Sequence, residues 1–146
     1  MDADLKNLNN LAIGPVNRKH LEILPQLTGL EYVTIWGWDE MTDVSLLSGL
    51  TELKWLYLDM WQLSSLKGIE SLSRLENLTI HSDISLDLSP LAALKNLHIL
   101  DVSGIKTGDW SVLNELHELE QVICTESQKT LIQKILPENK FNFVIK

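Results

Sequence analysis

The chain has 146 residues, which is about one domain of material, and this size excludes a multidomain enzyme. Its 20 acidic and 12 basic side chains give a formal net charge of -8, so we expect no binding to nucleic acid or anionic membranes. No apolar run approaches the length of a membrane span, and a protein partner with a basic surface fits the charge better.

Leucine occupies 29 of the 146 positions and follows a register. A pattern of the form LxxLx[LIV] starts at Leu8 and recurs at intervals of 22, 23, 22, 22 and 22 residues. Its alternating end predicts a short strand in each unit. The six patterns are Leu8, Leu11, Ile13; Leu30, Val33, Ile35; Leu53, Leu56, Leu58; Leu75, Leu78, Ile80; Leu97, Leu100, Val102; and Leu119, Val122, Cys124.

A second apolar series follows each pattern, with its members three residues apart. This spacing predicts a short helix or 3₁₀ turn after each strand. A unit of this length cannot bury its own apolar side, so successive units must stack, with their strands paired in parallel. The series are Leu21, Leu24, Leu27; Val44, Leu47, Leu50; Leu66, Ile69, Leu72; Leu88, Leu91, Leu94; and Trp110, Leu113, Leu116.

In these leucines the chain resembles leucine-rich-repeat proteins, in particular the 22-residue bacterial repeats of internalins. The resemblance implies an α/β solenoid with a parallel sheet on its concave face and short helices or 3₁₀ turns on its convex face. It implies one domain over residues 1–146, with repeats starting near 8, 30, 53, 75, 97 and 119. The asparagine that the family carries at the ninth position is replaced here, so the turn amides need other partners, such as water or local turns. The replacing residues are Val16, Trp38, Trp61, Asp83 and Ile105.

The two ends of the stack have their own patterns. Residues 1–7 are too few for a substantial cap, and Gly14 and Pro15 blunt the first strand. Residues 127–136 have helical spacing, with Leu131, Ile132 and Ile135 expected on one side, and Pro137 ends the helix. Because residue 141 lies 22 positions after residue 119, we expect a seventh strand over 141–145 and a cap over 127–146.

Large aromatic side chains gather at the strand positions that should face the concave side. If successive strands align in register, these residues form one surface, and Trp and Tyr often dominate binding at interfaces. The alternative is that the rings fill the concavity by packing on one another. The candidate partner-binding residues are Tyr32, Trp36, Trp38, Trp55, Tyr57, Asp59, Trp61, His81 and Asp101.

An enzymatic alternative places Ser103 beside His81, with Asp59 on the other side and Asp101 diagonal to it. An open sheet offers no oxyanion hole, so we expect no catalysis. Trp110 and Cys124 occupy core positions. No ligand spacing for a metal and no phosphate-binding loop occurs, and no cofactor is expected.

The sequence therefore favours a protein-binding module. By its architecture it also resembles the leucine-rich-repeat immunity proteins of bacterial toxin systems, which would make it an inhibitor of a basic toxin domain. A structural adaptor without inhibitory role is the alternative, and association with a second copy is open. The single cysteine and the lack of a secretory pattern at Met1–Asp4 predict a cytoplasmic location.

Overall fold

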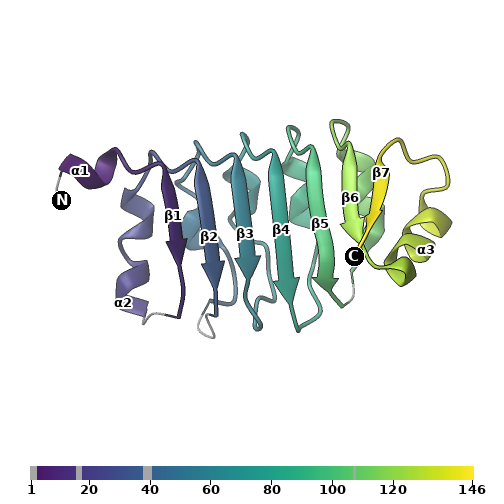
Figure 1. The fold of residues 1–146 in the computed structure, drawn as a ribbon, viewed down its shortest axis with the longest axis horizontal. Coiled ribbons are helices and arrows are strands. Elements are labelled where there is room, and N and C mark those ends of the chain that lie inside the picture. Colours follow the sequence, from purple (N-terminus) through teal and green to yellow (C-terminus); the bar gives the residue numbers. More distant parts are fainter. Residues whose placement is uncertain (1–2, 16–17, 38–40, 107) are drawn as a thin grey trace.

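The structure, a computed structural model, describes residues 3–15, 18–37, 41–106 and 108–146. These residues form one parallel sheet of seven strands, which lie side by side in chain order (Figure 1). The predicted parallel solenoid is thereby confirmed, including its seventh strand. The strands are β1 (Asn10–Ile13), β2 (Tyr32–Trp36), β3 (Trp55–Asp59), β4 (Asn77–Ser82), β5 (Ile99–Ile105), β6 (Gln121–Cys124) and β7 (Asn142–Ile145).

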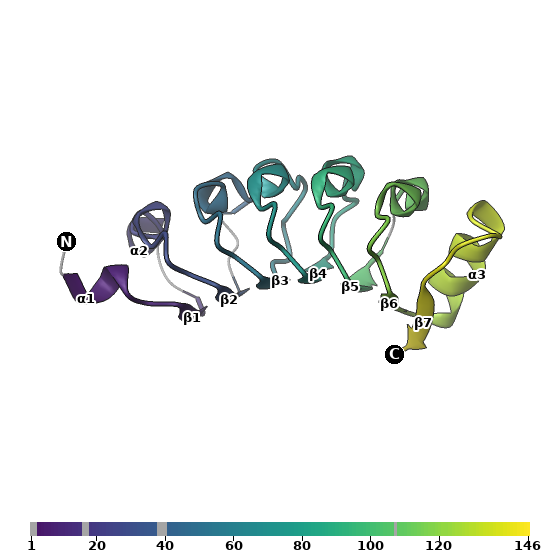
Figure 2. The same cartoon turned by 90° about the horizontal axis from the view of Figure 1, so that it is seen from above.

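Short helical segments form a second layer on the outer side of the curved sheet (Figure 2). Five are 3₁₀ turns, as apolar residues three apart predict in so short a span. The sheet thus lines the concave side and the turns line the convex side. The layer consists of α2 (Arg18–Leu21), η1 (Leu24–Gln26), η2 (Ser45–Leu47), η3 (Ile69–Ser71), η4 (Ser89–Ala93) and η5 (Trp110–Glu115), while α1 (Ala3–Lys6) and α3 (Glu126–Ile135) lie at the two ends of the stack.

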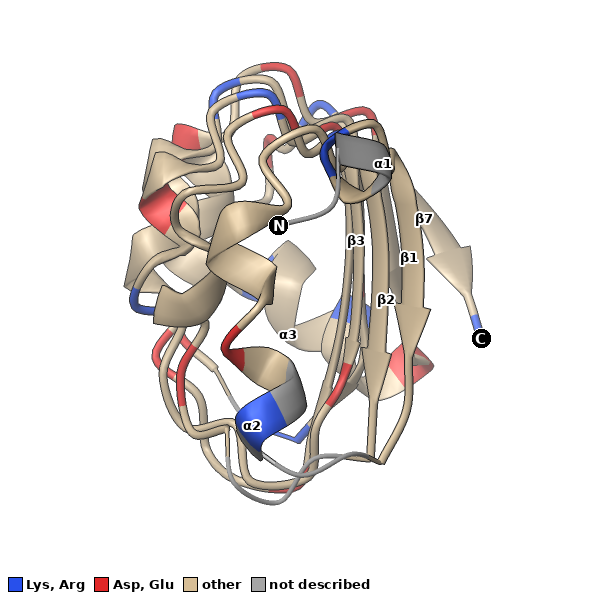
Figure 3. Ribbon diagram, turned by 90° about the vertical axis from the view of Figure 1, so that its left-hand side faces the viewer, with Lys and Arg blue, Asp and Glu red and all other residues tan. Residues whose placement is uncertain are grey.

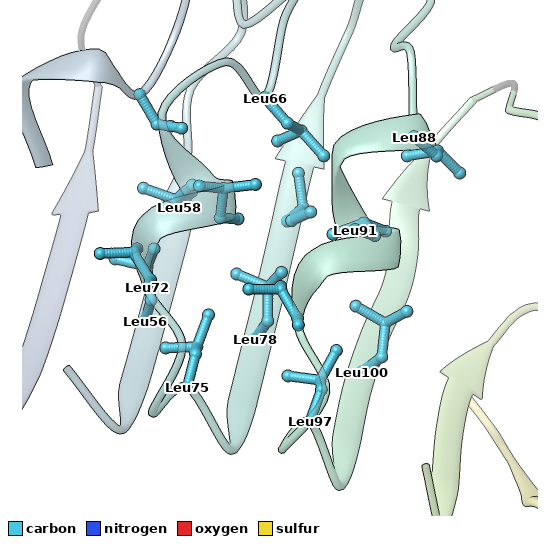
Figure 4. Packing of buried hydrophobic residues seen from close by; sticks show 14 of the residues in the cluster. Leu56, Leu58, Leu66, Leu72, Leu75, Leu78, Leu88, Leu91, Leu97 and Leu100 are labelled. Carbon is cyan, nitrogen blue, oxygen red and sulfur yellow. The ribbon is translucent and has the colours of Figure 1, made fainter. Parts of the chain in front are cut away.

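The leucines of both patterns meet between the two layers (Figure 4). Leu56, Leu78 and Leu100 are register partners on neighbouring strands, and each is buried. Trp110 and Cys124 are buried as predicted. Burial raises the pKa of the Cys124 thiol, so the reactive thiolate is disfavoured at this position.

The turns that leave the strands find backbone partners in the next repeat. The amide of Gly37 donates to the carbonyl of Asp59 at 3.0 Å, and the amide of Met60 donates to the carbonyl of His81 at 3.1 Å. In one repeat a side chain also takes part in these hydrogen bonds: the buried hydroxyl of Ser82 donates to the carbonyl of Leu63. Carbonyls of neighbouring repeats therefore serve some of these amides, and a local turn serves another, as the sequence suggested: the amide of Leu63 donates to the carbonyl of Met60 at 3.1 Å.

One glycine lies where two successive repeats come closest on the convex side. Gly68 precedes η3 and has a φ of 104°, a conformation that other residues rarely adopt. A Cβ at this position would lie 2.6 Å from the Cα of Ser45 on the preceding turn. Backbone packing between η2 and η3 therefore requires a residue without a side chain here.

The C-terminal cap differs from its prediction in the side that α3 buries. Thr125 and Gln128 form a capping box, which sets the helix so that Gln128 and Ile132 face the core. Leu131 and Ile135, expected on the same side of the helix as the buried Ile132, are exposed. The buried amide of Gln128 donates to the carbonyls of Val102 and Ile105 at 2.8 Å, so α3 is bonded to β5.

Candidate functional site

The parallel register brings the aromatic residues of β2 and β3 together on the concave side. Tyr32 pairs with Trp55, and Trp36 pairs with Asp59. Tyr32 and Trp36 are 42% and 40% exposed, whereas Trp55 and Tyr57 are half-buried. The rings form the predicted surface and are partly packed on one another. We call this surface the concave patch, and it consists of Tyr32, Trp36, Trp55, Tyr57, Asp59 and His81.

Contacts among the rings fix the centre of the concave patch. The rings of Trp55 and Tyr57 are stacked, with centroids 6.3 Å apart, and Tyr57 meets His81 edge-on at 5.5 Å. Burial raises the pKa of Tyr57, and the nearby carboxylate of Asp59 raises it further, so its phenol keeps its proton at neutral pH. Stacked rings lose little conformational freedom on binding, which favours a recognition role.

The ring of Trp36 in the concave patch packs over a glycine. The indole of Trp36 lies over Gly14, at the end of β1, where a Cβ would approach the ring within 2.7 Å. The two residues occupy the same position in successive repeats. A small residue next to a large ring at one repeat position is the sequence signal by which this packing could have been predicted.

The expected row of Ser103, His81 and Asp59 is not formed. The register shifts after Thr79, so His81 pairs with Gly104. An extra residue in β5 causes this bulge. The imidazole lies against Gly104 and within 4.0 Å of a carboxylate oxygen of Asp59, and its Nε2 is buried without a partner among the described residues. The prediction that Ser103 lies beside His81 is wrong, which removes the nucleophile from the enzymatic alternative.

The carboxylate of Asp101 is buried, although the sequence predicted it as part of the exposed surface. Its side chain is 6% exposed, because Lys146 covers it with an ion pair of 2.7 Å and Ser103 donates two hydrogen bonds to it. Burial alone would raise the pKa of Asp101, but the hydrogen bonds from Lys146 and Ser103 outweigh it and hold the pKa below its ordinary value. Lys146 lies outside the repeats, so no repeat pattern could indicate this contact.

Replacing Asp101 with asparagine should make stability less sensitive to acid. A carboxylate whose pKa is lowered by folding contributes stability above its ordinary pKa of 3.8, and this contribution is lost as the pH falls through the folded-state pKa. We expect D101N to lower the free energy of unfolding by about 1–2 kcal/mol at pH 7, since asparagine still accepts from Ser103. Urea unfolding at pH 7 and below pH 3.8 measures both values.

The difference in the free energy of unfolding between D101N and the wild type should be smaller at the lower pH than at pH 7. Lys146→Met is the matched variant, because it removes the ammonium and leaves the carboxylate in place. If this difference in the free energy of unfolding stayed constant from neutral to acidic pH, it would contradict the assignment of Asp101 as an ionised, ion-paired group.

The remaining candidates lie at the rim beyond the strands. Trp61 follows β3 and is exposed, as predicted. Asp83, one repeat further on, pairs with Lys106 at 3.2 Å. Trp38 lies outside the described residues. Trp61 therefore presents an exposed ring just beyond the carboxyl end of β3.

Charged residues concentrate in the turns at the two ends of the strands and in the convex layer, and the strands contain few of them (Figure 3). Within the described ranges, no helix has the length and apolar character needed to cross a membrane. The same residues contain no group of three or more His, Cys, Asp or Glu arranged to hold a metal ion.

No protein-family profile matches the chain, and no curated protein matches it. Solved structures do. A leucine-rich-repeat protein of Leptospira interrogans has a TM-score of 0.65 and 21% identity over 97% of this chain. Listeria monocytogenes internalin C2 has a TM-score of 0.59 and 27% identity over 82%, and a second internalin from that organism has 0.58 and 22% over 84%.

The chain spans only 38%, 53% and 42% of the lengths of these three structures, respectively. The likeness extends over the strands and the turns between them, and at this level of identity it concerns the fold. Together with the parallel register and the 3₁₀ turns on the convex side, it identifies the fold as a leucine-rich-repeat solenoid.

Proposed function

We propose that this chain is a protein-binding module that holds its partner against the concave patch. The observation that carries this proposal is the exposure of Tyr32 and Trp36 beside the stacked rings of Trp55 and Tyr57. The curved inner sheets of solenoids commonly serve as binding surfaces, and ordered aromatic rings are the side chains that contribute most to interface affinity. Folding alone does not require them there.

Within this role, we assign the chain to the cytoplasm as an immunity protein that neutralises a toxin domain with a basic surface. Its net charge of -8 supports the choice of partner, because opposite charges accelerate association and favour basic surfaces over acidic ones. The lone free cysteine, which is buried, is compatible with a reducing compartment.

Trp55→Ala should weaken partner binding by about 2 kcal/mol, which is roughly thirtyfold in the dissociation constant. Removing this ring also removes its stack on Tyr57. The partner is first captured by a photo-crosslinking residue at Thr34, between the exposed rings of β2, and compared with the same residue at the convex Ala93. Calorimetry with the purified partner then measures affinity, and thermal unfolding measures stability.

The control for Trp55→Ala is Leu131→Ala, which removes an exposed apolar side chain from α3. We expect this control to leave the affinity unchanged. If Trp55→Ala lowers the melting temperature strongly and leaves the affinity intact, the rings serve packing and the proposed site is wrong. Toxicity of the captured partner in cells, relieved by co-expression of this chain, separates an inhibitor from an adaptor.

A further inference from the structure

Asp59 places a carboxylate within the concave patch. It ends β3, and the register sets it between Trp36 on β2 and His81 on β4. Its side chain is 36% exposed, and a ring nitrogen of His81 lies 4.0 Å from its carboxylate. This separation is longer than a hydrogen bond, so the carboxylate oxygens stay available for a donor.

The chain itself shows how a carboxylate on this face is neutralised. Two strands away, Asp101 receives the ammonium of Lys146 at 2.7 Å and becomes buried beneath it. No lysine or arginine among the described residues lies within ion-pair distance of Asp59. Asp59, which is 36% exposed, is solvated in the free protein and would come to need a cation when a partner covers it.

One aromatic side chain lies next to this carboxylate. Tyr57 is two residues before Asp59 on the same face of β3, and its ring is stacked on Trp55. The indole of Trp36 is turned over Gly14 on the β1 side, away from Asp59. Aromatic faces attract cations that lie within about 6 Å of the ring centre. An arginine fits such surroundings better than a lysine, because its planar guanidinium can stack on a ring and bond both carboxylate oxygens.

We propose that Asp59 receives an arginine side chain of the protein partner, which stacks on the ring of Tyr57. This inference rests on the proposed function and specifies its chemistry: the basic surface of the partner presents at least one guanidinium at the centre of the interface. Asp59 and Tyr57 then act together, the carboxylate by charge and hydrogen bonds and the ring by cation–π contact.

The test uses the full chain and a defined probe. N-acetyl-arginine methylamide is titrated into labelled protein and followed by the NMR shifts of backbone and indole groups. N-acetyl-citrulline methylamide is the control, since it has nearly the same shape and no charge. We expect arginine to shift the resonances of Trp36, Tyr57, Asp59 and His81 at millimolar concentration, and citrulline to leave them unchanged.

Asp59→Asn should weaken arginine binding by about threefold to fivefold, as expected for a partly exposed ion pair. The matched variant Glu118→Gln removes the same charge from the exposed turn before β6 and should have no effect. Equal shifts with citrulline, or equal losses in the two variants, would overturn the arginine site.

The purified partner separates this inference from the proposed function. If Trp55→Ala weakens partner binding and Asp59→Asn does not, the concave patch binds without a central arginine and the inference is wrong. If neither variant has an effect, the proposed function is wrong as well. If Trp55→Ala and Asp59→Asn both weaken partner binding, and substitution of a single arginine of the partner weakens it too, the results support the proposed function and the arginine site.

Discussion

Leu78→Ala should lower the free energy of unfolding by about 2–5 kcal/mol, because it leaves a cavity in a closely packed core. Leu78 lies on the central strand β4 and is buried between Leu56 and Leu100, its partners on the two adjoining strands. Loss of its side chain therefore weakens the packing of three repeats at once. Urea unfolding followed by circular dichroism measures the change.

Thr79→Ala is the control for this substitution. Thr79 is the next residue on the same strand and points to the concave side, where it is half-buried. We expect the change at Thr79 to stay within about 0.5–1 kcal/mol of the wild type. Equal losses at the two positions would contradict the assignment of the leucine series to the interior.

Gly68→Ala should destabilise the fold by about 1–3 kcal/mol from the backbone alone, since its φ of 104° is strained for a residue with a side chain. The new methyl group adds to this loss, because it would lie 2.6 Å from the Cα of Ser45, and backbone atoms cannot rotate away. Thermal and urea unfolding measure the change.

Gly49→Ala provides the matched comparison on the same side of the molecule. The nearest atom to a Cβ at Gly49 is the carbonyl oxygen of Pro25 at 3.9 Å, an ordinary contact, and its φ is not positive. Alanine there should be neutral or stabilise the protein by up to about 1 kcal/mol through the unfolded chain. If Gly68→Ala and Gly49→Ala changed the free energy of unfolding equally, the close approach of η2 and η3 would not require glycine at position 68.

The architecture could be predicted from the sequence because burial repeats with the chain. Each unit places its inward side chains at the same positions, so the register of one strand pair determines the next. The strand β2, for example, covers Tyr32–Trp36, where alternating residues were expected. Spacing alone also located β7, although the buried Phe141 directly before it has no leucine pattern around it.

The site could be predicted only where strict alternation holds. At Tyr32, Trp36, Trp55 and Tyr57 the strands keep their register, and the rings lie together on the concave side. Alternation fails in β5, where the bulge and a lysine 45 positions away decide the surroundings of Asp101. Such contacts depend on how distant segments meet in three dimensions, and a local pattern does not contain them.

The hydrogen bonds of the Gln128 side-chain amide affect the order in which parts of the solenoid unfold. It joins α3 to β5 across the strand between them, whereas α1 and α2 at the other end have four residues each. In a stack whose units contact mainly their neighbours, loss of structure spreads from the less firmly held end. We therefore expect amide hydrogen exchange to be slower in β5, β6 and α3 than in β1, because the Gln128 hydrogen bonds must break before these three elements separate.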